Sequence, residues 1–165
     1  MTLGQALENE HREIDGGIES FVAAMDSKGR TSPTSLLTAF SGLRRHIYLE
    51  ETFLFPPLKA AGLMGPLFVM LREHGQLWNQ MGTIESLLST ETQKGGEVQK
   101  ATQGQKVTLR SACAALLQLL DAHNSKEETI IYAQADEILD SAAGSELLSF
   151  LEKGTMPQGW VCGVS

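Results

Sequence analysis

The stretch LLTAFSGLRRHIYLEETF, residues 36–53, places apolar side chains at every third or fourth position, as one face of an α-helix requires. His46 and Glu50 fall on the same apolar stripe, four residues apart. A carboxylate at a core position is costly unless another group neutralises it. The segment therefore predicts a buried helix that carries a polar pair on its inward face.

Three more segments show the same periodicity, and each carries one histidine on its apolar stripe. The chain has four histidines in all, so each predicted helix supplies one. His123 and Glu127 repeat the four-residue spacing of His46 and Glu50. The three further stripes run over Leu7–Met25, Leu67–Leu88 and Leu109–Ile130.

The periodicity predicts an all-α protein, because no stretch alternates apolar and polar residues for long enough to form a strand. Four helices of about 20 residues with short-to-medium loops predict an antiparallel four-helix bundle. We expect loops at Lys28–Arg30 and over most of Thr90–Gln105, and an end or kink at Pro56–Pro57. A short fifth helix, Ser145–Lys153 with Ser145 as its cap, completes a domain over residues 1–153, and residues 154–165 form an irregular tail.

Composition narrows the classes of function. A net charge of −7 argues against binding to nucleic acid or to an anionic membrane surface. No apolar run is long enough for a transmembrane helix, and the first residues lack the features of a signal peptide. Two cysteines are too few for a disulfide framework, so we expect a cytoplasmic protein.

The histidines and the two in-phase glutamates form a candidate metal site. Residues four apart in a helix lie about 40° apart around the axis and about 6 Å along it, so both members of each pair can reach one central point. Two bridging carboxylates and two imidazoles per ion leave room for an oxo or hydroxo bridge and a small guest. The candidate ligands are His11, His46, Glu50, His74, His123 and Glu127.

The donor types favour iron, with manganese second. Structural zinc usually has cysteine among four ligands, and the Glu-x-x-His word of ferritin-type bundles does not occur at these positions. One His-x-x-x-Glu pair alone is usually a solvated ion pair, but the joint pattern on four helices favours a metal site. Glu51 and Glu128 lie about 100° from the stripes. They are expected at the surface, as are Glu10 and Glu73, for which a bond to a ligand ring is the alternative. No role is assigned to Tyr48 or Tyr132.

These motifs resemble the hemerythrin-like, or HHE cation-binding, family over residues 3–135. The resemblance rests on His11, HIYLEE at 46–51 with FP at 55–56, EH at 73–74, and HNSKEE at 123–128. It implies a non-heme Fe–O–Fe pair in a four-helix bundle. His11 and His46 would hold one iron, His74 and His123 would hold the other, and Glu50 and Glu127 would bridge the two.

One position departs from the oxygen-carrying members of that family, which have a fifth histidine one turn after the third-helix histidine. Trp78 stands there, and we expect its indole to pack in the core and to shape a guest pocket. The four-histidine, two-glutamate set is also similar to the di-iron domain of proteins that repair iron centres after nitrosative stress.

The resemblance implies a small partner, namely oxygen, nitric oxide or peroxide. Turnover of the guest would make the protein a catalase-like or nitric-oxide-handling enzyme, but the sequence assigns no catalytic residue and no redox partner. Two alternatives stay open. One is iron storage, donation, sensing or iron-centre repair with metal-linked folding, and the other is a partner-binding bundle with a structural metal.

Overall fold

The computed structural model describes residues 1–26, 31–92 and 103–164, all in helices, turns or short irregular segments without a strand. The all-α prediction is therefore confirmed for these ranges. The predicted loop at Lys28–Arg30 and the central part of the loop at Thr90–Gln105 lie outside them. The elements are α1 (Leu3–Asp26), α2 (Thr34–Leu49), η1 (Glu50–Leu54), α3 (Phe55–Ala60), α4 (Met64–Thr92), α5 (Gln103–Lys126), η3 (Glu127–Ile131), α6 (Tyr132–Ile138) and α7 (Ser141–Lys153).

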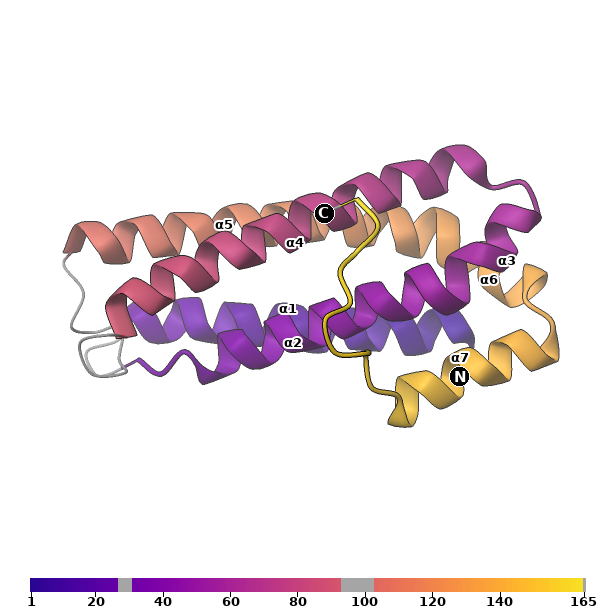
Figure 1. Ribbon diagram of the computed structural model, residues 1–165, viewed down its shortest axis with the longest axis horizontal. Helices are drawn as coiled ribbons and strands as arrows, with labels where there is room; N and C mark the ends of the chain where they lie inside the picture. Colours follow the sequence, from indigo (N-terminus) through magenta and orange to yellow (C-terminus); the bar gives the residue numbers. More distant parts are fainter. Residues whose placement is uncertain (27–30, 93–102, 165) are drawn as a thin grey trace.

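Four long helices, α1, α2, α4 and α5, run along the long axis of the molecule (Figure 1). α1 packs on α2 and α5, and α4 packs on α5. α7 lies beside α2 and η1, and the tail crosses α2 towards α4 (Figure 1). These contacts make a helical bundle, while the antiparallel order of the four helices stays a prediction.

Two helices pass into a π-helical turn at the glutamate of their His-x-x-x-Glu word. η1 begins at Glu50 and η3 begins at Glu127. The amide of Phe55 donates to the carbonyl of Glu50, and the amide of Tyr132 donates to that of Glu127, five residues back in each case. Single π-helical turns occur often at functional sites because they change which side chains face inward.

The chain does not leave its helical path at Pro56 and Pro57. Both prolines lie in the first turn of α3, where a missing N–H costs little, and α3 continues to Ala60. The fifth helix is longer than expected, because it begins at Ser141 instead of Ser145. Its cap is Asp140, whose carboxylate accepts a hydrogen bond of 2.8 Å from the amide of Ala143.

The buried apolar side chains form two clusters. One joins the middle and far parts of α1, α2, α4 and α5, and includes Ile14, Ile47 and Leu120. The other joins the starts of α1 and α4 and the end of α2 with η1, α3, η3, α6 and α7, and includes Leu7, Leu54 and Met70. On every long helix the histidine falls between residues of the two clusters, so the polar candidates form a layer between two apolar halves.

Within the described ranges, no helix is both long enough and apolar enough to cross a membrane.

Candidate metal centre

The structure brings the six predicted ligands together in the polar layer. Glu50, His74 and Glu127 are fully buried, and the other three side chains are nearly so. They form two groups of four, and within each group the donor atoms lie within 4.8 Å of one another. The first group is His11, His46, Glu50 and Glu127, and the second is Glu50, His74, His123 and Glu127.

Each of the two glutamates divides its oxygens between the groups. Glu50 Oε1 lies 3.3 Å from His46 Nε2, and Glu50 Oε2 lies 3.2 Å from His74 Nε2. Glu127 Oε2 lies 3.4 Å from His11 Nε2, and Glu127 Oε1 lies 3.1 Å from His123 Nε2. Both carboxylates therefore have the geometry of a bridge between two cation positions.

Three buried donor atoms of the second group have no hydrogen-bond partner among the described residues: Glu50 Oε2, His74 Nε2 and Glu127 Oε1. His74 Nε2 lies 3.2 Å from Glu50 Oε2 and 3.6 Å from Glu127 Oε1, but neither contact has hydrogen-bond geometry. A buried polar atom without a partner costs about 1–3 kcal/mol. A cation among them would satisfy all three, so the residues fit a metal.

Each candidate imidazole directs Nε2 inwards and donates its Nδ1 proton to a glutamate outside the six. Such a partner fixes the tautomer and the orientation of a ligand ring. The pairs are Glu128 with His11 (3.0 Å), Glu10 with His46 (2.6 Å), Glu51 with His74 (2.9 Å) and Glu73 with His123 (2.9 Å).

The expectation of surface charges is therefore wrong for these glutamates, and for Glu10 and Glu73 the alternative, a bond to a ligand ring, is confirmed. The side chains of Glu51 and Glu73 are less than a tenth exposed, and even the most open one, Glu128, is only 35% exposed. These glutamates do lie off the apolar stripes, but each reaches across to a neighbouring helix. Two kinds of residue pair in the sequence mark these four glutamates: Glu-His at 10–11 and 73–74, and Glu-Glu at 50–51 and 127–128.

The buried carboxylates are ionised. Burial and the charge of Glu127 oppose ionisation of Glu50, but the neighbouring imidazoles, His46 first, outweigh both and lower its pKa to about 2. Burial likewise opposes ionisation of Glu127, and the charge of His123 outweighs it, so the Glu127 pKa falls well below its usual value. The centre therefore presents two negative charges to a cation.

Three of the imidazoles, those of His46, His74 and His123, have raised pKa values when no cation is bound. Burial alone would lower the pKa of His46, but the charge of Glu50 and the hydrogen bond to Glu10 raise it to about 10. Against the same effect of burial, the buried glutamates raise the pKa of His74 and of His123. Because a ligating imidazole must be neutral, uptake of a metal has to displace these protons.

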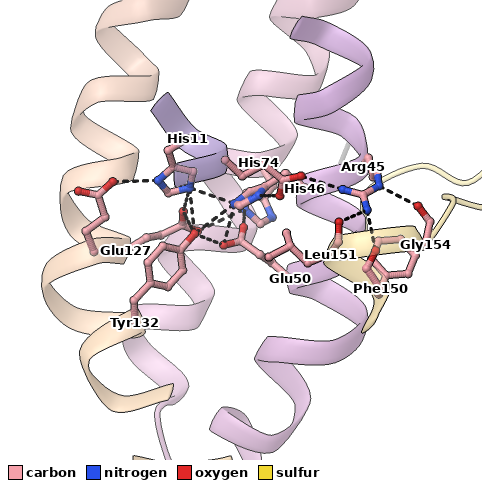
Figure 2. A network of polar contacts seen from close by, with 12 residues as sticks. His11, Arg45, His46, Glu50, His74, Glu127, Tyr132, Phe150, Leu151 and Gly154 are labelled. Atoms are coloured by element: carbon pink, nitrogen blue, oxygen red, sulfur yellow. Dashed lines mark hydrogen bonds and ion pairs between the residues drawn. The ribbon is translucent and has the colours of Figure 1, made fainter. Parts of the chain in front are cut away.

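Tyr132, to which the sequence assigned no role, lies inside the centre. Its ring points at His11, His46 and Glu50 (Figure 2), and its hydroxyl donates a 2.5 Å hydrogen bond to Glu50 Oε1. Burial and the charges of Glu127 and Glu50 raise the pKa of the phenol well above 10.0, so the metal-free protein holds it protonated.

The π-helical turn η3 explains why the periodicity missed this residue. Tyr132 follows Glu127 by five positions, which in a regular α-helix places the two about 140° apart. The wider turn brings Tyr132 back to the inward face. Nothing in the sequence except the repeated HxxxEE word marks the turn.

Trp78 is half-buried, and its indole contacts other residues than the six candidates. The ring lies edge-on to Trp160 at 5.5 Å between centroids, and the guanidinium of Arg44 lies over it at 5.4 Å. The part of the prediction that gave Trp78 a core position agrees with its packing against the first apolar cluster. Its role in a guest pocket stays a prediction.

The four glutamates that accept the Nδ1 protons, Glu10, Glu51, Glu73 and Glu128, are called the outer glutamates below. The C-terminal segment is attached to two of them. Arg45 donates to the carbonyls of Phe150, Leu151 and Gly154 at the end of α7, and also to Glu10 (Figure 2). Further along the tail, the amide of Gly163 donates a 3.0 Å hydrogen bond to Glu51.

The donor set of each group is two imidazole nitrogens and two carboxylate oxygens, without thiolate. Two histidines with carboxylate and further open positions are typical of non-heme iron sites. The two groups share their carboxylates, so the arrangement suits two cations that lie close together.

Comparison with known protein families identifies the family. The profile of the hemerythrin HHE cation-binding domain covers residues 2–135, which include all six candidate ligands and Tyr132. Searches of curated proteins and of solved structures gave no match. The match spans most of the chain, and the buried histidine and glutamate groups described above fit the cation binding after which that family is named. The chain therefore belongs to the hemerythrin HHE cation-binding family.

Proposed function

We propose that the protein holds a pair of iron ions and uses them to bind, or react with, a small guest: oxygen, nitric oxide or peroxide. His11 and His46 would hold one ion, His74 and His123 the other, and Glu50 and Glu127 would bridge them. The observation that carries this proposal is the pair of buried donor groups that share the carboxylates of Glu50 and Glu127, because each group could hold one cation. An iron pair supplies electrons and an open coordination position.

The surrounding residues would orient the ligands and keep bulk water out. The four outer glutamates hold each ring with Nε2 facing inwards. The two apolar clusters enclose the polar layer from both sides. In such a setting an electrostatic interaction is stronger than it would be in water.

An apolar pocket of about 110 Å³ is lined by residues that neighbour the second group in the sequence. Met70 and Ile131 line it, one helical turn from His74 and Glu127 respectively. The atoms that face the pocket are apolar, and the ammonium of Lys126, one of its lining residues, is bonded to Glu73. Such a surface suits an uncharged diatomic molecule better than a large or ionic substrate.

Metal analysis of the bridging variants tests the iron pair. We expect two iron ions per chain in the wild type and none in Glu50→Ala or Glu127→Ala, because each carboxylate serves both positions. Glu137→Ala, at an exposed glutamate of α6, is the matched control and should keep both ions. If either bridging variant kept two irons, the shared assignment of Glu50 and Glu127 would be wrong.

The guest is tested on the iron-loaded protein. Oxygen release from peroxide, followed beside a titration with nitric oxide, separates turnover from simple binding. An absorption spectrum that responds to none of the three guests would contradict the proposal.

The position of the centre favours a second candidate function, iron storage, donation or sensing. The polar layer separates two apolar clusters, so a cation that joins the four helices there stabilises the whole bundle. In this case chelation should cause a large loss of helix by circular dichroism, and the loaded protein should turn over no guest.

A further inference from the structure

The hydroxyl of Tyr132 is close to every donor atom of the first group. It lies 2.9 Å from His11 Nε2 and 3.1 Å from His46 Nε2. It also lies 2.5 Å from Glu50 Oε1 and 3.3 Å from Glu127 Oε2. Within the described ranges, this hydroxyl makes no hydrogen bond to His74 or His123, and its bonds to the shared glutamates use the oxygens that face the first group.

These separations match those of neighbouring ligands around one metal ion. Nitrogen and oxygen ligands bind first-row metals at about 2.0–2.2 Å, so adjacent corners of an octahedron lie about 3 Å apart. In the first group the two Nε2 atoms of His11 and His46 are 3.0 Å apart, and the tyrosine oxygen keeps the same spacing from both. With a cation bound among these atoms, it would lie where a further ligand is expected.

The backbone holds Tyr132 at this point from two sides. The π-helical turn η3 directs it inwards, and the Tyr132 amide closes that turn on Glu127. Gly4 of α1 lies against it, since a Cβ added there would meet the Cβ of Tyr132 at 3.3 Å. A larger residue at position 4 would displace the tyrosine, so the close approach of α1 and α6 helps to place the hydroxyl.

We propose that Tyr132 is a fifth protein ligand of the cation in the first group, bound through its phenolate oxygen. On binding, the phenol O–H bond breaks, the proton leaves to solvent, and the oxygen donates an electron pair to the cation; no electron is transferred. The inference rests on the proposed iron pair and makes that pair unsymmetric. The first group then has five protein donors and the second has four, so the open positions lie mainly at the second group, on the side of the apolar pocket.

Spectroscopy of the iron-loaded protein tests this ligand directly. A ferric phenolate gives a visible charge-transfer band, and excitation in that band enhances phenolate ring vibrations in the Raman spectrum. We expect both in the wild type, and we expect Tyr132→Phe to lose both while it keeps two irons per chain.

The only other tyrosine of the chain is the matched control. Tyr48 packs against Phe53, Phe150 and Trp160, away from the six candidates. Tyr48→Phe should therefore keep the band and the phenolate vibrations. Because Tyr132 is then the sole tyrosine, this variant identifies the ligand even if Tyr132→Phe does not fold.

The outcomes separate the two proposals. Two irons per chain without phenolate vibrations, or vibrations lost in Tyr48→Phe, would overturn the tyrosine ligand and leave the iron pair standing. Phenolate ring vibrations that survive in folded Tyr132→Phe would overturn it as well. If the wild type binds no iron, the proposed function fails, and the tyrosine ligand fails with it.

Discussion

Replacing Glu10 by glutamine removes one charge beside the metal centre and keeps the shape of the side chain. The carboxylate of Glu10 accepts two hydrogen bonds, one from His46 Nδ1 at 2.6 Å and one from Arg45 Nη1 at 2.7 Å. An amide has one oxygen, so in Glu10→Gln one of these donors faces an NH₂ group. Either His46 loses the hydrogen bond that orients its ring, or Arg45 loses its hydrogen bond to residue 10.

The size of the effect follows from how many donors each outer glutamate serves. Loss of a partner of a metal-bound histidine typically costs 10–100-fold in metal affinity, about 1.4–2.8 kcal/mol. We expect Glu10→Gln near the upper end, about 100-fold. Within the described ranges, Glu128 bonds only to His11, and it is more exposed than Glu10. The amide oxygen of Glu128→Gln can keep that bond, so the loss should be about tenfold.

The assay is competition for ferrous iron against a chelator of known affinity, without oxygen. Glu13→Gln is the control, because it makes the same charge change at an exposed position of α1 and should alter affinity by roughly twofold or less. Circular dichroism of each metal-free variant checks the fold. Equal losses in all three variants would mean that net charge, and not orientation of the rings, controls binding, and the reasoning from donor counts would be refuted.

Three further outcomes follow from the structure. The metal-free protein should lose stability as the pH rises from 6.5 towards about 10. Protonated His46 stabilises the fold, and this contribution is complete below pH 6.5, the pKa of an unfolded histidine, and is lost above about pH 10, the pKa of His46 in the folded protein. Urea unfolding at pH 6 and pH 9 measures the loss of stability. The metal-loaded protein, whose rings are neutral, should show no such loss. Equal stability of the metal-free protein at both pH values would contradict the prediction. Trp78→His should leave the absorption spectrum of the iron-loaded protein unchanged, since the indole contacts Arg44 and Trp160; a new band would return Trp78 to the guest pocket. Phe40→Ala removes a fully buried ring of the first apolar cluster, and denaturant titrations should show that the free energy of unfolding falls by about 3–5 kcal/mol. The iron spectrum should not shift. A shifted spectrum would show that this cluster helps to shape the metal centre.

Helical periodicity was enough to predict the meeting of the six candidates. Apolar residues at spacings of three and four identify the inward face of each helix, and a histidine in phase with them must point into the core. The same reasoning located the pairs His46–Glu50 and His123–Glu127 in the interior, where the structure has them.

What the periodicity missed depends on local departures from a regular helix and on neighbouring helices. Tyr132 is out of phase by α-helical counting, and only the π-helical turn after Glu127 brings it inwards. The outer glutamates are off the stripe on their own helices, and Glu10 bonds a histidine of α2 because α1 and α2 approach closely. A pattern along one helix does not contain either effect.

The attachment of the tail has a practical side for anyone who prepares the protein. Gly154 is joined through Arg45 and Glu10 to one histidine, and Gly163 is joined through Glu51 to another. A proteolytic nick in this segment, or a bulky fusion behind it, would loosen rings at both cation positions at once. An affinity handle therefore belongs at Met1, which is 90% exposed, and the iron content of each preparation would reveal clipping of the tail.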